Sequence, residues 1–185
     1  MSEPRNTRER IQQIAMELFS EQGYDRTSLR EIAERLNVTK AALYYHFKTK
    51  EDIAASYFDD FAADVDKVRE WAETQPADLD TRREILRRYS DVMNTHGQTL
   101  RFIHHNQPAL REINKGRTFK ERMQQVNKLL VDAEAPAIER LRGVNALFIM
   151  HMAWFVELDG DPDPADLQEP ALQIALELIE TNEKS

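Results

Sequence analysis

The apolar residues of this chain recur every three or four positions in long segments, which is the spacing of one face of an α-helix. The first such segment runs from about Thr7 to Gln22 and is followed by Gly23. Its apolar face consists of Ile11, Ile14, Leu18 and Phe19. Asn6 and Glu9 resemble a capping box, and glycine favours the left-handed conformation that ends helices. We therefore predict a helix over residues 7–22.

Two short helices are predicted next. Ser28 and Glu31 have the spacing of a capping box, so a second helix begins at Ser28 and ends at Asn37, a residue that tolerates the left-handed conformation. Thr39 can cap a third helix that ends at His46. The two helices meet across the three residues 37–39, which is the spacing of a helix-turn-helix motif.

Longer helices are predicted beyond residue 51. Their approximate ranges are 51–74, 81–96, a segment after 97 that Pro108 kinks or splits, one after 114–116, one of more than 20 residues after Pro136, and a last one after 160–164. No segment has a convincing strand pattern. The fold class is therefore all-α with about nine helices, in a three-helix domain over residues 1–50 and a second helical domain over residues 51–185.

Composition limits the possible functions. The 185 residues include 41% apolar and 31% charged residues, an ordinary globular balance. The absence of cysteine excludes disulfides, thiolate zinc sites and cysteine nucleophiles. The most apolar run, 144–156, is shorter than the roughly 20 residues of a bilayer span, and the polar start does not fit a signal peptide. We expect a cytoplasmic protein with no membrane association.

Charge is unevenly distributed along the chain. The net charge is −8, but the segment 26–50 carries six basic and two acidic residues, whereas residues 51–185 carry 16 basic and 26 acidic ones. A basic amino-terminal domain on an acidic body is compatible with nucleic-acid binding through that domain alone.

The third helix has the composition of a DNA-contacting surface. On a helical wheel Leu43 and Phe47 share one side, Ala41 and Tyr45 lie opposite, and Tyr44 and Lys48 flank them. A major groove admits one helix, small residues allow a close approach, and lysine and tyrosine can donate to bases or phosphates. An ordinary solvent-exposed surface is the alternative. The predicted DNA-binding residues are Thr27, Arg30, Thr39, Lys40, Ala41, Tyr44, Tyr45, His46, Lys48 and Lys50.

The segment "IAMELFSEQGYDRTSLREIAERLNVTKAALYYHFKTKEDI" resembles the amino-terminal domain of the TetR (tetracycline repressor-like) family of bacterial transcription regulators, over about residues 8–53. The resemblance implies a DNA-binding domain joined to a helical dimerisation and ligand-binding domain, usually in a repressor released by a small molecule. It also implies that Thr27, Thr39, Lys40, Ala41, Tyr44, Tyr45, His46 and Lys50 occupy DNA-contacting positions. Asn37 stands where the family usually has glycine, and Ala41-Ala42 departs from a common glycine or hydroxyl residue.

The last two long helices are too apolar for the surface of a monomer. In the first of them, we expect Leu141, Phe148, Met152 and Phe155 to face the protomer's core, and Val144, Leu147, His151 and Trp154 to face elsewhere. In the second, Leu172, Leu176 and Ile179 form one stripe, and Ile174 and Leu178 another. Two such helices predict a homodimer held by a four-helix bundle. The alternative is that both are central helices of one protomer.

Aromatic and sulfur-containing residues of the second domain are candidates for a ligand cavity: Trp71, Tyr89, Met93, Phe102, Phe119, Met123, His151 and Trp154. Plain core packing is the alternative for each of them. His96, His104 and His105 do not form a convincing metal site, because adjacent helical residues point about 100° apart. No metal or cofactor is expected.

Three functional hypotheses follow. The first is a homodimeric repressor that a small molecule releases from a near-palindromic DNA operator. The second is a DNA-binding regulator without an inducer, controlled by its abundance or by a protein partner. The third is a helical enzyme or carrier, which is disfavoured because no acid–base pair, activated nucleophile or phosphate-binding glycine loop is found in the sequence.

Overall fold

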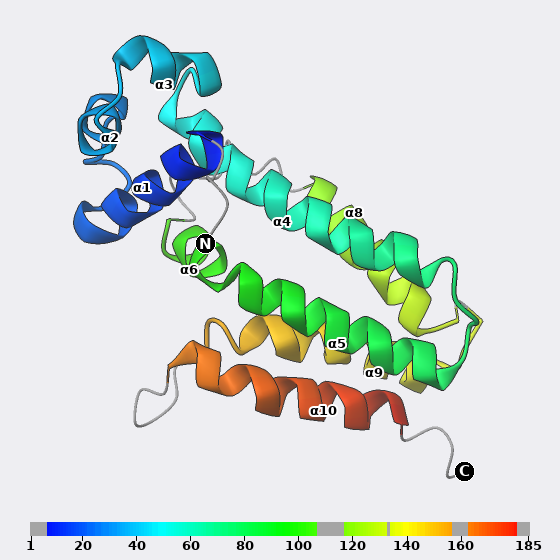
Figure 1. Cartoon of the computed structure of the whole chain (residues 1–185). Coiled ribbons are helices and arrows are strands. Elements are labelled where there is room, and N and C mark those ends of the chain that lie inside the picture. Colours follow the sequence, from blue (N-terminus) through cyan, green and yellow to red (C-terminus); the bar gives the residue numbers. More distant parts are fainter. Residues whose placement is uncertain (1–6, 107–116, 133, 157–162, 181–185) are drawn as a thin grey trace, which may run out of the picture. The chain divides into compact units, whose positions relative to one another are not determined.

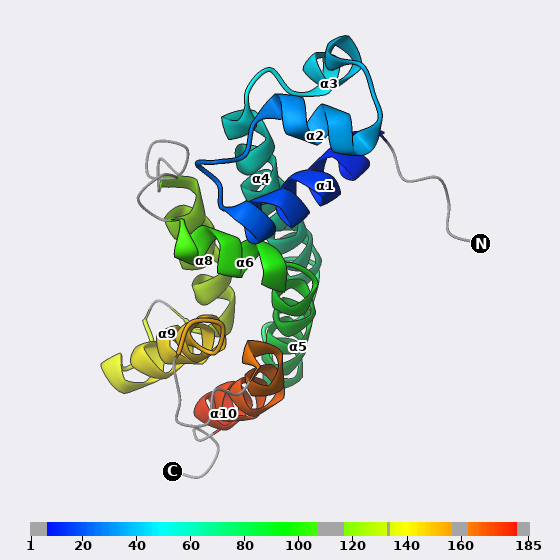
Figure 2. The same cartoon turned by 90° about the vertical axis from the view of Figure 1, so that its left-hand side faces the viewer.

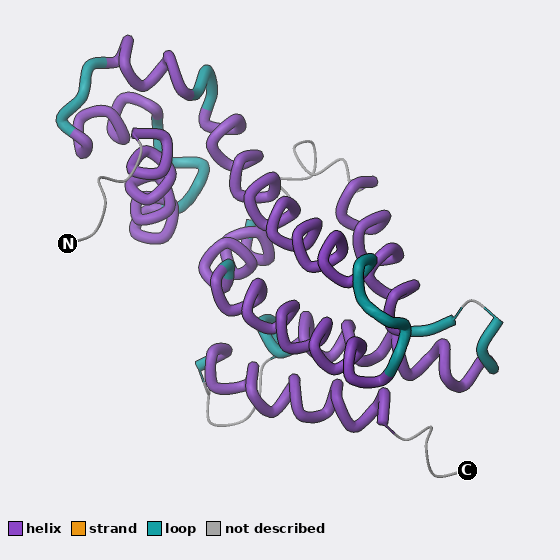
Figure 3. The backbone as a smooth tube through the Cα atoms, turned by 45° about the vertical axis from the view of Figure 1, so that its right-hand side comes forward, coloured by secondary structure: helices purple, strands orange, loops and turns teal. Residues whose placement is uncertain are grey.

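The computed structural model describes residues 7–106, 117–132, 134–156 and 163–180, with the side chains of 117–123 excepted. These residues form nine α-helices and one short 3-10 helix, with no strand among them (Figure 3). The helices are α1 (Thr7–Gln22), α2 (Leu29–Leu36), α3 (Lys40–His46), α4 (Lys50–Ala72), α5 (Leu79–Thr95), α6 (Gly97–His105), α8 (Arg117–Leu130), α9 (Ala137–Met152) and α10 (Gln168–Glu180), with η1 (Pro164–Leu167) before α10. The all-α prediction is confirmed. The expected kink at Pro108 and the cap at Asn6 lie outside the described residues.

The chain forms two compact units. The first contains residues 1–60 and 102–115, and the second contains residues 61–101 and 116–185. Both α4 and α6 therefore begin in one unit and end in the other. The sequence placed a boundary after residue 50 and did not predict that the first unit also contains the first half of α4 and part of α6.

Local capping determines the helix ends in the first unit. Gly23 ends α1 with a φ of +91°, and the capping box of Ser28 and Glu31 begins α2. Asn37 has a φ of +55°, and its N–H donates to the carbonyls of Ala33 and Glu34. All three features were predicted, because each depends on residues close together in the sequence.

The core of the first unit is built around α1. Leu43 and Phe47 are buried beside Ile11. Phe102, from α6, lies in this same core, with its ring stacked on that of Phe19 at a centroid distance of 5.2 Å. The prediction that Phe102 belongs with the ligand-cavity residues of the second domain is therefore wrong. Nothing in the local pattern around Phe102 indicates a partner more than 80 positions away.

Buried polar contacts join α1 to α4. The Gln12 side-chain amide donates to Ser56 Oγ at 2.9 Å and to Asp60 Oδ2 at 2.6 Å. The Tyr57 hydroxyl donates to the Gln12 carbonyl at 2.5 Å. Burial raises the pKa of Tyr57, so this hydroxyl keeps its proton and remains a donor.

In the second unit α5, α9 and α10 lie side by side, and α8 packs against α5 and α9 (Figures 1 and 2). Tyr89 and Met93 of α5 and Met150 of α9 are fully or almost fully buried between them. Gly97, at the start of α6, allows a close approach: a Cβ added there would lie 2.2 Å from the Trp154 ring. Glycine is therefore needed at this position for packing.

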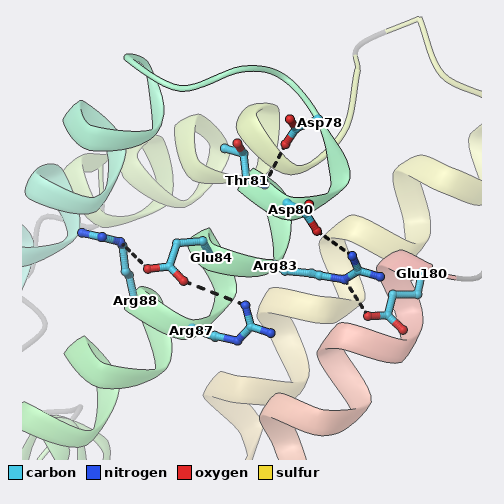
Figure 4. Close-up of polar contacts among 8 residues, drawn as sticks. All are labelled: Asp78, Asp80, Thr81, Arg83, Glu84, Arg87, Arg88 and Glu180. Carbon is cyan, nitrogen blue, oxygen red and sulfur yellow. Dashed lines mark hydrogen bonds and ion pairs between the residues drawn. The ribbon is translucent and has the colours of Figure 1, made fainter.

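A network of ion pairs joins α5 to α10 at the surface (Figure 4). Asp78 caps α5 through the Thr81 N–H at 2.9 Å. Arg83 then bonds to both Asp80, at 2.7 Å, and Glu180 of α10, at 2.8 Å. Exposed pairs of this kind contribute about 0.2–1 kcal/mol each, so the network mainly fixes the alignment of the two helices.

The predicted orientation of the penultimate long helix is wrong at four residues, whereas Val144 is exposed and Phe155 packs against the core, as predicted. Leu141 and Phe148 of α9 are exposed, whereas Leu147 and Trp154 are buried. The helix also ends at Met152, after 16 residues instead of more than 20. Because the segment is apolar on both sides, its sequence pattern cannot distinguish the side that faces the core from the side that faces outward.

Candidate DNA-binding surface

Capping and two apolar anchors hold α3 in place. The Thr39 hydroxyl accepts a hydrogen bond from the Ala42 N–H at 3.2 Å at the start of the helix. Leu43 and Phe47 are buried below it. The residues 37–39 form the turn between α2 and α3, as predicted. The anchoring fixes which side of α3 points to solvent.

The exposed side of α3 is aromatic, small and basic. Tyr45 is 81% exposed and Tyr44 is 44% exposed. Lys40 and Ala41 are exposed in the first turn, and His46 is half-buried, with its ring edge-on to that of Tyr45. The structure thus exposes Lys40, Ala41, Tyr44 and Tyr45 on α3, with Thr39 exposed at its cap and His46 half-buried at its end. Such a surface can place donors against phosphates and small side chains against base edges.

Two further predicted residues lie near this face and are exposed. Lys48 follows α3, and its Nζ donates to the Tyr44 carbonyl at 2.8 Å, which holds the cation at the carboxyl end of the helix. Arg30, on α2, forms a surface ion pair with Glu34 at 2.7 Å. Both contacts are exposed, so exchanging them for phosphate contacts costs little.

The remaining two predicted residues have internal roles. Thr27 is buried, and its hydroxyl donates to the Gly23 carbonyl at 2.9 Å. The Lys50 Nζ donates to the carbonyl of Tyr24 at 2.8 Å and to those of Asp25 and Thr27 at 3.3 Å each. Lys50 therefore fastens the α1–α2 loop to the start of α4, and the sequence did not predict this structural role.

The predicted ligand residues of the second unit are largely packed into its core. Tyr89, Met93 and Trp154 are buried. The Arg88 guanidinium lies 3.9 Å from the centre of the Trp71 ring, on its face. The side chains of Phe119 and Met123 lie outside the described residues. Of the described side chains in this set, Trp71, Tyr89, Met93, His151 and Trp154 do not line the cavities described in this unit.

His151 and Tyr89 form a buried polar pair between α9 and α5. The Tyr89 hydroxyl and His151 Nε2 are within hydrogen-bonding distance. Burial lowers the pKa of His151 to about 4 and raises that of Tyr89, so both groups are neutral near pH 7. The pair satisfies two polar groups inside an apolar core, which is a structural role.

The second unit exposes an apolar face on its last helices. Ile138, Leu141 and Phe148 of α9 are between 57% and 58% exposed, and Ile174 of α10 is 45% exposed. The α9 residues are three and seven positions apart, so they share one side of the helix. A contiguous exposed apolar stripe of this kind marks an interaction surface.

An open groove of about 550 Å³ lies between α8 and α9. Asn127, Lys128 and Val131 of α8 and Arg140 and Leu141 of α9 are among the residues that line it. The sequence analysis missed this groove. Its residues are ordinary surface types, and only the crossing of the two helices brings them together.

Among the described residues, no cluster of three or more metal-ligating side chains is present. The same part of the chain contains no helix that is long and apolar enough to cross a membrane. A short exposed helix joined to a capped helix by a three-residue turn, with tyrosines and cations on its outer side, defines the helix-turn-helix class of DNA-binding proteins.

Comparison with known proteins finds a family match in the first part of the chain. Residues 11–57 match the bacterial regulatory proteins of the tetR family. The HTH-type transcriptional regulator AcrR of Shigella flexneri is 38% identical over 86 residues, which cover 45% of this chain and 40% of AcrR. The biofilm operon icaADBC negative transcriptional regulator IcaR of Staphylococcus epidermidis is 43% identical over 61 residues, or 29% of this chain and 33% of IcaR. The matches thus span less than half the length of these relatives.

The whole fold is also similar to solved structures. A TetR/AcrR-family transcriptional regulator from Aquifex aeolicus matches with a TM-score of 0.72 and 22% identity, over 94% of this chain and 99% of that one. The TetR-family regulator PfmR from Thermus thermophilus matches with a TM-score of 0.67 and 22% identity, over 91% and 97% of the two chains. Residues 11–57 therefore resemble the tetR family of bacterial regulatory proteins, and the chain has the fold of TetR-family transcriptional regulators.

Proposed function

We propose that this protein is a homodimeric transcriptional regulator that binds a near-palindromic DNA site through α3 and represses transcription until a small molecule releases it. The observation that carries the proposal is the outer face of α3, where Tyr44, Tyr45 and Lys40 are exposed on a helix anchored by Leu43 and Phe47. The name of IcaR, a negative transcriptional regulator, supports repression as the direction of control.

Dimerisation is proposed through α9 and α10. Ile138, Leu141, Phe148 and Ile174 are exposed on two helices that pack against each other, which supports a four-helix contact between two copies. Leu172 and Leu176, by contrast, pack against the protomer's own core. One α3 reads few base pairs, so two are needed, entering major grooves about one helical turn, or a multiple of it, apart.

Release by a small molecule requires a ligand that binds more tightly to the form with low DNA affinity. A coupling of about 1–3 kcal/mol changes DNA affinity 5–150-fold. The polypeptide connects the two units through α4 and α6, each of which begins in one unit and ends in the other. We propose these two helices as the covalent route by which binding in the second unit affects α3.

Selection from a random-sequence DNA library tests the proposal. The purified protein should enrich a near-palindrome, and fluorescence anisotropy should show tighter binding to the selected DNA than to its scrambled version. The affinity for both should fall as salt rises, because phosphate contacts release counterions. No enriched sequence together with equal affinity for both DNAs, or no binding at low salt, would contradict the proposed function.

A further inference from the structure

The groove between α8 and α9 combines a curved apolar surface with unmatched positive charge. Val131, Leu141 and Val144 supply the apolar surface, and Leu141 and Val144 are exposed. The volume of about 550 Å³ lies within the range of roughly 300–1,000 Å³ that is typical of small-molecule sites.

Two cations border this surface. Lys128 of α8 and Arg140 of α9 line the groove and are exposed. Among the described residues neither of them forms an ion pair, whereas the arginines of α5 shown in Figure 4 all do. The carboxylate in the groove lining, Asp132, accepts a hydrogen bond from the Glu134 N–H at 2.9 Å. The local charge therefore favours an anion.

We propose that the α8–α9 groove is a binding site for an amphipathic organic anion, such as an N-acyl amino acid. Its apolar chain lies along Val131, Leu141 and Val144, and its carboxylate faces Lys128 and Arg140. The regulatory meaning of this site rests on the proposed function, because Leu141 also belongs to the α9 face proposed for dimerisation. Binding itself is measurable without DNA.

The charge of the groove favours this ligand over a second copy of the chain as its occupant. A second copy covering the groove would take two cations out of water without an established partner, and the burial of unpaired charge is costly. A small anion neutralises them instead. Ile138 and Phe148 do not line the groove and remain available for dimerisation, whereas Leu141 is shared by the groove and the dimer face.

Isothermal titration calorimetry with N-decanoylglycine tests the proposal on the full chain. Its methyl ester has the same acyl chain but lacks the charge. The acid should bind, and the methyl ester should bind at least about fivefold more weakly. The double variant Lys128→Gln/Arg140→Gln should weaken binding of the acid about tenfold and leave the methyl ester unchanged. An exposed charge contact contributes about 0.2–1 kcal/mol, so the loss of two such contacts can account for a tenfold loss of affinity.

The matched control is Arg82→Gln/Arg87→Gln on α5, which removes the same charge from elsewhere in the second unit and should not change binding. Circular dichroism verifies that each variant is folded.

Three results would overturn the proposal: no heat of binding for the acid at millimolar concentration, equal affinity for the acid and its methyl ester, or the same loss in the control double variant. Binding of the acid that appears only after Phe148→Glu, outside the groove lining, has separated the protomers would show that the groove is covered by a second copy, and would also overturn it. None of these results bears on DNA binding, so the proposed function is tested separately.

Discussion

The exposed face of α3 and the exposed face of α9 both leave large side chains in contact with solvent, but they differ in what surrounds those side chains. Tyr44 and Tyr45 carry hydroxyls and have Lys40 and Lys48 beside them. Leu141 and Phe148 have no polar atoms in their side chains. Tyrosine beside lysine suits a polyanion, and aliphatic or phenyl groups in a stripe suit another protein surface. Exposure alone would not have separated these two roles.

The largest expected effect comes from placing charge on the α9 face. Leu141→Glu/Phe148→Glu should raise the Kd of the dimer by about a thousandfold or more, because burial of unpaired carboxylates costs several kcal/mol. Sedimentation equilibrium measures the change. Gln125→Glu, at an exposed position of α8, is the control and should leave the Kd unchanged. A double variant with the wild-type Kd would show that the dimer, if present, forms elsewhere.

The next largest effect is a pH dependence of the free energy of unfolding, which arises from His151 of α9. Burial lowers the pKa of His151 to about 4, whereas in the unfolded chain it titrates near 6.5. Neutral His151 therefore makes its full contribution to the free energy of unfolding above about pH 6.5. The free energy of unfolding should fall by about 3 kcal/mol as the pH is lowered from there toward 4.

His151→Gln removes this titration. Urea unfolding from pH 7 to pH 4 should show a free-energy loss for the wild type that exceeds the loss for the variant by about that amount. Parallel curves for the two proteins would mean that His151 is not held neutral by the fold.

A substitution at Gly97 tests the close packing of this residue against Trp154 in the second unit. Gly97→Ala should lower the free energy of unfolding by about 1–3 kcal/mol, because the new methyl would overlap the Trp154 ring. Helix propensity alone predicts the opposite sign, since alanine is the better helix former by about 1 kcal/mol. Gln98→Ala, at the exposed neighbouring position, controls for propensity. Stabilisation by both substitutions would contradict the close contact.

The smallest expected effect concerns the α1–α2 loop, which Lys50 fastens to the start of α4. Lys50→Met should lower the free energy of unfolding by about 1–2 kcal/mol, because three carbonyls of the α1–α2 loop lose a charged donor. Lys48→Met, which loses one exposed contact, should cost less than about 0.5 kcal/mol. Chemical denaturation measures both. Equal effects would show that Lys50 does not fasten the loop, and loss of DNA affinity without loss of stability would return it to the binding surface.

Sequence reasoning succeeded where neighbouring residues determine the structure. The Ser28 capping box, the left-handed Asn37 and the buried Leu43 and Phe47 are all local features, and they suffice to orient α3. The exposure of Tyr44 and Tyr45 follows from the same local features, and their contact with DNA stays a prediction. Lys50 is the exception, because its partners lie 23 to 26 positions away.

Sequence reasoning failed where distant segments decide. The side of α9 that faces inward depends on α5 and α10, and no periodicity in an apolar helix gives that information. Phe102 packs with α1 because α6 ends in the first unit, which only the tertiary fold determines. The α8–α9 groove likewise exists only through a helix crossing.

The central claim is that the outer face of α3 contacts DNA, and one measurement tests it most directly. Fluorescence anisotropy with the selected DNA should show at least tenfold weaker binding for Tyr44→Ala/Tyr45→Ala than for the wild type, since hydrogen bonds to charged phosphates contribute about 1.5–3 kcal/mol each. Arg87→Ala, in the second unit, is the control and should bind as the wild type does. Wild-type affinity in a folded double variant would contradict the account.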